Sequence, residues 1–275
     1  MSRSIALGQF YPASSPLHKL DPRMKIILAV AYIVTSFLCK NIFSFALLLV
    51  SAFVLILISR IPVRVVLGSI KAIIFVMVFT AVLNIFWTAG DEENLLFSWR
   101  FIHIYTDGLY NALFIIIRII SMIVGSCMFL TYTTTPIQLT DGIESLLSPL
   151  KKLGIPVHEF AMMMTIALRF IPTIIEETGK IMSAQKARGA DFTNGSLIQR
   201  AKALIPVLIP LFISAFRRAG ELATAMTCRC YRGGEGRTKL HVLKVKPRDF
   251  VALALMVMFI AAVVLINIFG FGYTM

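Results

Sequence analysis

Two short stretches of this 275-residue chain place an arginine between small residues at the end of an apolar helical pattern. The first is Ala187, Arg188 and Gly189, and its echo 41 positions later is Cys228, Arg229 and Cys230. A guanidinium group is a planar fork of donors that pairs bidentately with carboxylates. Small neighbours leave such a group open to a partner. The duplication therefore suggests two exposed arginines that meet two similar receiving surfaces.

Amphipathic helical patterns lead into both arginines. An apolar stripe continues from Pro172 to Arg188, and Gly189 is a natural helix stop. A second stripe of small and apolar residues leads to Arg229. We expect two long amphipathic helices that cross beneath a membrane and end in matched arginines; ordinary solvated helices with scattered positive charge are the alternative.

Several breaks are expected in this region. The apolar run 160–168 ends at Arg169 and is too short to span a bilayer. A new helix is expected to begin at Pro172. Pro206 and Pro210 are expected to interrupt the second helical stretch. Upstream, Thr135 and Gln138 have the spacing of a capping box.

Composition places the chain in a membrane. Hydrophobic residues make up 58% of it and charged residues only 15%, which is too apolar for a soluble domain of this size. The net charge of +13 could suggest a nucleic-acid partner. However, several uncharged runs of spanning length favour the lipid bilayer instead, because cytoplasmic membrane loops are positively charged anyway.

Five spans are predicted in an all-α polytopic membrane protein. The organisation is a leader with four transmembrane helices in 1–132, cytoplasmic coupling helices in 133–248, and a last transmembrane helix in 249–275. The spans are expected at 22–39, 42–59, 67–89, 108–132 and 250–270. Asp21 and Pro22 form a helix start, with the carboxylate as N-cap.

Orientation follows from the basic residues. Seventeen of the 27 lysines and arginines fall in 133–248, and shorter basic groups precede the first span and separate the second from the third. With five spans all three groups lie on one side, which the positive-inside rule makes the cytoplasm. The N-terminus is then cytoplasmic, and the acidic loop 90–107 and the C-terminus are outside.

Two features within the apolar patterns have open roles. Arg118 lies deep in the fourth span, where a charge costs roughly 2.5 to 3.5 kcal/mol without a partner. It could contact a substrate, but a structural arginine that bonds to carbonyls or to Asp107 is favoured. The run Met162, Met163 and Met164 could be an adaptable docking surface or an ordinary part of the core.

Several chemistries lack their motifs. No phosphate-binding loop of the form G-x-x-x-x-G-K-[ST] is present, so we do not expect this chain to hydrolyse ATP. Its four histidines are scattered without an H-E-x-x-H motif. Cys228 and Cys230 lack two further ligands for a soft metal. We predict no enzyme activity, cofactor or metal site.

Four motifs in order resemble the transmembrane T component of energy-coupling factor (ECF) transporters. They are SPLHKLDPRMK at 15–25, TTTPIQLTDGIESLLSPLKKLGIP at 133–156, LRFIPTIIEETGKIMSAQKARG at 168–189 and AFRRAGELATAMTCRCYRGG at 215–234. The resemblance covers nearly the whole chain.

That resemblance implies a scaffold in a prokaryotic cell membrane. In the family, the T component joins two cytoplasmic ABC-type ATPases to a small membrane-embedded substrate-binding S component, for ATP-driven uptake of vitamins or transition-metal ions. Its two Ala-Arg-Gly motifs dock into the ATPases. Here the first motif is intact at Ala187, Arg188 and Gly189, whereas the second keeps only Arg229 and has Cys228 and Cys230 as flanks.

The substrate and two other classes of function stay open. The tail RGGEGRTK at 232–239 looks more like T components that serve several vitamin-specific partners than those of cobalt or nickel uptake systems. A membrane-embedded enzyme is disfavoured because no nucleophile, base or metal constellation is apparent. A self-sufficient secondary transporter would need internal repeats among its spans, and none is visible.

Overall fold

The structure, a computed structural model, describes residues 10–87, 95–99, 102–192, 196–233 and 243–270. These residues form two compact units. The bundle unit is built from Gly8–Ile143 and Leu243–Met275, and the crossed-helix unit from Glu144–Val242. The bundle unit contains α1 (Pro22–Leu38), α2 (Ile42–Ser59), α3 (Val63–Trp87), β1 (Leu95–Trp99), β2 (Ile102–Tyr105), α4 (Thr106–Ser126), a π-helical turn (Cys127–Thr131) and α8 (Pro247–Ile268). The crossed-helix unit contains α6 (Val157–Ala187) and α7 (Leu197–Cys228), and α5 (Pro136–Leu147) spans the division between the units.

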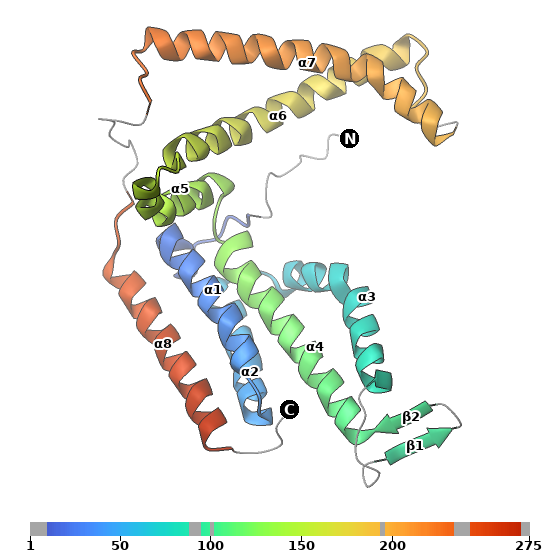
Figure 1. Ribbon diagram of the computed structural model, residues 1–275, viewed down its shortest axis with the longest axis vertical. Helices are drawn as coiled ribbons and strands as arrows, with labels where there is room; N and C mark the ends of the chain where they lie inside the picture. The colour runs from blue at the N-terminus through green and yellow to red at the C-terminus, as the bar shows by residue number, and fades with distance from the viewer. Residues whose placement is uncertain (1–9, 88–94, 100–101, 193–195, 234–242, 271–275) are drawn as a thin grey trace. The chain divides into compact units, whose positions relative to one another are not determined.

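Helix α4 is the centre of the bundle unit, where it packs against α1, α2 and α3 (Figure 1). Helix α8 packs on α1 and α2. Aromatic rings join these helices: Phe45 of α2 stacks on Phe114 of α4 at 4.7 Å between ring centroids, an arrangement that stabilises beyond simple burial. The tight contact of four helices explains why small and polar side chains occur among their buried residues.

A glycine lets α1 and α4 approach each other. A Cβ atom added to Gly125 would lie 2.3 Å from the ring of Tyr32. That ring is 2% exposed and its hydroxyl lies 3.0 Å from the Ser51 hydroxyl. The crossing of α1 over α4 therefore depends on the missing side chain at position 125.

Hydrogen bonds between buried polar groups hold the N-terminal end of α1 in place. The Asp249 carboxylate accepts a hydrogen bond from the backbone N–H of Asp21 at 2.9 Å and another from that of Lys246 at 2.7 Å. Nearby, the Lys25 ammonium donates to the Thr133 carbonyl at 2.7 Å. Asp249 thus ties the N-terminal ends of α1 and α8 together, which links segments more than 200 residues apart in sequence.

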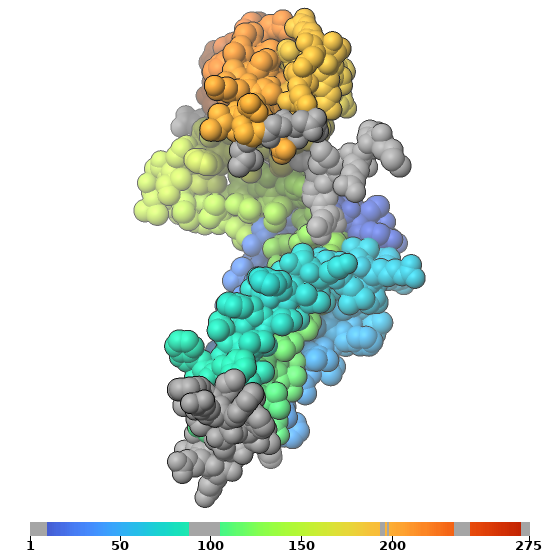
Figure 2. Space-filling view, turned by 90° about the vertical axis from the view of Figure 1, so that its right-hand side faces the viewer, coloured from blue at the N-terminus to red at the C-terminus, as the bar shows by residue number. Residues whose placement is uncertain are grey.

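The outer surface of the bundle unit is apolar. Helix α3 is an exposed ridge of this unit, cyan in Figure 2, and large apolar side chains such as Phe75 and Trp87 are exposed along it. Six of the described helices are long and apolar enough to cross a membrane: α2, α3, α4 with its π-helical turn, α6, α7 and α8. An apolar exterior on helices of this length is what lipid requires, and the prediction of an all-α polytopic membrane protein is confirmed.

The predicted spans correspond to α1, α2, α3, α4 and α8. Helix α1 has 17 residues, the lower end of spanning length. Helices α6 and α7 are also long enough to span, but they are the least apolar of the six candidates. We retain the five-span topology as a prediction.

Two expectations about local structure were wrong. Helix α6 continues through Arg169 and Pro172, and α7 continues through Pro206 and Pro210. A proline removes one hydrogen bond, but turns already formed on both sides keep the chain helical. In addition, part of the predicted acidic loop forms an antiparallel hairpin, in which β1 pairs with β2.

Predicted helix starts are confirmed. The Asp21 carboxylate accepts a hydrogen bond from the Arg23 N–H at 2.9 Å. Thr135 and Gln138 exchange the two hydrogen bonds of a capping box, at 3.2 and 3.3 Å.

Candidate functional site

The first arginine is the C-terminal cap of α6. Arg188 follows the last helical residue and its N–H still bonds to the Ala184 carbonyl at 3.2 Å. Gly189 then adopts a left-handed conformation, with φ of +88°. The N–H of Gly189 bonds to the Lys186 carbonyl at 3.0 Å, and that of Ala190 to the Gln185 carbonyl at 3.0 Å. These two bonds define a Schellman motif.

The second arginine caps α7 in the same way. The Arg229 N–H bonds to the Ala225 carbonyl at 3.2 Å, the Cys230 N–H to the Thr227 carbonyl at 2.9 Å, and the Tyr231 N–H to the Met226 carbonyl at 3.0 Å. Cys230 takes the left-handed position, with φ of +59°. The altered flanks therefore leave the backbone of the motif intact, although a side chain at a left-handed position is strained.

Both arginines are presented to the surroundings. Every residue of the two motifs is exposed, and within the described part of the chain no side-chain hydrogen bond or ion pair involves Arg188 or Arg229. Helices α6 and α7 run in opposite directions, so their C-terminal ends point to opposite ends of the crossed-helix unit (Figure 1). The site thus consists of two similar cationic tips facing away from each other.

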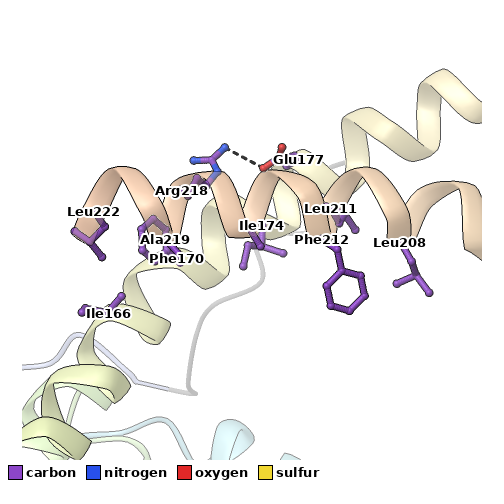
Figure 3. Close-up of a pocket in the computed structure, with 11 residues that line it drawn as sticks. Ile166, Phe170, Ile174, Glu177, Leu208, Leu211, Phe212, Arg218, Ala219 and Leu222 are labelled. Atoms are coloured by element: carbon purple, nitrogen blue, oxygen red, sulfur yellow. Dashed lines mark hydrogen bonds and ion pairs between the residues drawn. The ribbon is translucent and has the colours of Figure 1, made fainter. Parts of the chain in front are cut away.

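An ion pair holds the two helices at their crossing. The Arg218 guanidinium donates to the Glu177 carboxylate at 2.9 Å (Figure 3), and the Arg218 Nε lies 3.4 Å from the Ser214 hydroxyl. Hydrogen bonding with Ser214 and the charge of Arg218 lower the pKa of Glu177 below its ordinary value. The carboxylate is therefore ionised at neutral pH, as the pair requires.

An apolar groove of about 350 Å³ lies beside this ion pair. Its lining is almost entirely aliphatic and aromatic, with Phe170 and Ile174 from α6 and Leu208, Phe212 and Leu222 from α7 among its residues. Figure 3 shows Leu208, Phe212 and Leu222 on one side of α7 and Arg218 on the other. Glu177 and Arg218 also line this groove, so the ion pair borders an open apolar surface at the crossing.

The start of α7 has a capping box that was not predicted from the sequence. The Ser196 hydroxyl accepts from the Gln199 N–H at 3.4 Å, and the Gln199 side chain accepts from the Ser196 N–H at 3.0 Å. The signal was present as Ser-x-x-Gln before an apolar run. This cap fixes the first turn of the helix that carries Arg229.

Arg118 is not part of the arginine-tip site. Its guanidinium donates to the Cys39 carbonyl at 3.1 Å and lies 5.2 Å from the centre of the Phe45 ring. Carbonyl bonding and a cation–π contact are the compensation that a charge within a span needs. These contacts favour the structural interpretation of Arg118.

The methionine run and the two cysteines are the remaining candidate residues. Met163 and Met164 are about half exposed at 52% and 50%, which removes the ordinary core role for these two side chains. Among the described residues, no group of three or more metal-ligating side chains lies close enough to hold an ion. Cys228 and Cys230 are exposed free thiols.

A polytopic helical membrane protein with two outward arginine tips is the class of protein that this geometry defines. The chain matches the CbiQ family, described as cobalt transport protein, over residues 13–240. It also matches proteins named energy-coupling factor transporter transmembrane protein EcfT. The relative from Clostridium kluyveri is 51% identical over 92% of this chain and 93% of its own length. The relative from Brevibacillus brevis is 46% identical over the full length of both chains.

A third such protein, from Ruminiclostridium cellulolyticum, is 49% identical over 97% of this chain and 98% of its own. The chain therefore belongs to the CbiQ/EcfT family of energy-coupling factor transporter transmembrane proteins. It is a membrane subunit of a transporter, and the resemblance drawn from its four motifs is confirmed.

Proposed function

We propose that the tips of α6 and α7 are the docking points for two cytoplasmic ABC-type ATPase subunits. The observation that carries this proposal is the pair of matching Schellman caps, each with an exposed arginine at the same position. Two equivalent tips at opposite ends of one unit fit two similar partners. Each partner would offer a carboxylate in a groove that the helix end can enter.

ATP hydrolysis would then belong to the partners. This chain would receive their motion through two rigid helices and pass it on, which is a mechanical role rather than a chemical one. The continuity of α6 and α7 through their prolines supports such a role, because an uninterrupted helix transmits displacement along its length.

The third partner would be a small membrane-embedded S component that binds the substrate. Apolar side chains that are unusually exposed along α7 support an apolar partner, notably Phe212 and Phe216 at 61% and 75% exposure. Exposed methionines on α6 add adaptable contact area. Such a surface fits a hydrophobic partner better than water.

We propose vitamins as the substrate class. Relatives along nearly the whole chain carry the energy-coupling factor name, and the tail at 232–239 resembles that of T components shared among vitamin-specific partners. Residues 234–239 of that tail lie outside the described residues. The family description as a cobalt transport protein keeps metal-ion uptake as the second candidate.

The two arginines can be tested in the complete complex. Arg188→Ala and Arg229→Ala should each reduce co-purification of the ATPases and substrate uptake, while the membrane part stays folded. Truncation of one partner of a buried charge pair costs about 2 to 5 kcal/mol. Arg→Lys should rescue only in part, because an ammonium group lacks the planar fork.

Arg200→Ala and Arg217→Ala are the matched controls, since both remove an exposed arginine from α7 away from its tip. They should leave assembly and uptake close to the wild-type level. Normal assembly and uptake in both tip variants, or equal damage from the controls, would replace the docking role with a diffuse electrostatic one.

A further inference from the structure

The 41-residue offset that relates the two arginines extends along both helices. The segment 176–189 aligns with 217–230, so that Gly179 corresponds to Gly220 and Glu177 to Arg218. Charges are inverted between the copies: two glutamates in α6 correspond to two arginines in α7, and Lys180 corresponds to Glu221. The two 14-residue segments are thus copies of one pattern in their glycine and arginine positions, with opposite charges at three aligned positions.

The ion pair at the crossing joins equivalent positions of the two copies. Glu177 contacts Arg218 at 2.9 Å, and exchanging the copies returns the same pair. The Glu177–Arg218 pair therefore lies at the same position in both aligned segments.

Both tips lie at the same distance along the helix from that point. Arg188 follows Glu177 by eleven residues, and Arg229 follows Arg218 by eleven. At 1.5 Å of rise per residue, each arm is about 16 Å long. Equal arms mean that rotation about the ion pair would displace both tips equally.

An open apolar groove borders the crossing. Its volume is about 350 Å³, and Leu208 and Phe212 at its edge are 49% and 61% exposed. Close-packed helices interlock and resist a change of angle. Among the described residues, one longer hydrogen bond accompanies the ion pair between these helices, from the Gln185 side chain to the Pro206 carbonyl at 3.5 Å. The 2.9 Å Glu177–Arg218 pair is therefore the firmer fixed point.

We infer that the Glu177–Arg218 ion pair is the pivot about which α6 and α7 change their crossing angle when the two ATPases move the arginine tips. This inference rests on the proposed docking of ATPases at those tips. Glu177 and Arg218 are positioning residues. They hold the C-terminal parts of α6 and α7 at a fixed point, so that Arg188 and Arg229 move together.

The test is a charge exchange in the complete, reconstituted transporter. Glu177→Arg should leave ATPase co-purification near normal, since the tips are intact, but lower uptake per ATP hydrolysed by about tenfold, because like charges at the crossing repel. The double variant Glu177→Arg with Arg218→Glu should restore coupling to within about twofold of wild type, as the pair is rebuilt with reversed polarity.

The matched control reverses the charge of the exposed neighbour alone, Glu176→Arg, and should leave coupling unchanged; Arg217 stays in place because its charge acts on Glu177. A milder variant, Glu177→Gln, covers the case in which charge reversal prevents folding. Spin labels placed at Lys186 and Thr227 through unnatural amino acids would report the distance between the tips. Its distribution should be narrow in wild type and broader in Glu177→Gln.

The pivot would be refuted by full coupling in Glu177→Arg, by no recovery in the double variant, or by an unchanged tip distribution in Glu177→Gln. Failure of the underlying docking proposal looks different. In that case wild type itself would not retain ATPases, and Arg188→Ala would be silent.

Discussion

Cys230 has an unfavourable backbone conformation within the proposed docking motif. It holds the left-handed position of the α7 cap at φ of +59°, where Gly189 stands in α6. A non-glycine residue there costs about 1 to 2 kcal/mol. Cys230→Gly should therefore stabilise the purified subunit by about 1 kcal/mol, measured as a raised thermal midpoint, with docking retained.

Cys228→Ala is the control for that change, because Cys228 is the last residue of α7 and needs no special backbone conformation. It should leave the midpoint within error of wild type. A Cys230→Gly variant that is less stable than wild type would show that the thiol makes a contact that outweighs the strain.

The end of α6 was easier to predict than the end of α7, because of one residue in each cap. Gly189 after an apolar stripe is a strong stop signal, and the end of α6 was therefore predictable. Cys230 carries no such signal, since only its place in the 41-residue repeat suggested a cap. The pairing of Glu177 with Arg218 depends on the crossing of two helices, which neither helix encodes alone.

Helix packing in the bundle unit makes Gly125 a sensitive position. Gly125→Ala would bring a Cβ to 2.3 Å from the buried Tyr32 ring, and overpacking of this kind costs about 1 to 3 kcal/mol. We expect a lower thermal midpoint and reduced abundance in the membrane. The measurement is thermal unfolding of the detergent-purified subunit.

Gly179→Ala is the matched control in α6, because nothing lies within 4 Å of the added Cβ. Alanine is the better helix former by about 1 kcal/mol, so this variant should be as stable as wild type or more so. Equal loss in both variants would show that the α1–α4 contact is not the cause.

Helix types and most helix limits could be predicted, because spans of about 20 apolar residues have a strong signal. The starts at Asp21 and Thr135 were also correct, since capping is encoded locally. Continuity of α6 through Pro172 was not predictable, because a proline can end or merely bend a helix according to its surroundings.

The predicted topology can be tested by the side of the membrane on which three positions lie. The five-span interpretation places Ser196 inside and Glu92 and Thr274 outside. Single cysteines at these positions in a cysteine-free background should react with a membrane-impermeant thiol reagent on intact cells at Glu92 and Thr274 only. Labelling at Ser196, or none at Glu92, would require a different number of spans.

The whole molecule comprises a helical membrane unit and a unit of two crossed helices that end in the two arginine tips. Its apolar exterior and its family membership indicate a membrane subunit of an energy-coupling factor transporter. None of the described side chains forms a group suited to hold a metal ion. We therefore expect the protein to act within an assembly.

Purification of the tagged chain from its native membrane, followed by identification of the co-purifying proteins, tests that claim most directly. We expect two nucleotide-binding subunits together with a small hydrophobic membrane protein, and loss of the nucleotide-binding subunits in the Arg188→Ala, Arg229→Ala double variant. A solitary wild-type chain that transports or catalyses by itself would contradict this expectation.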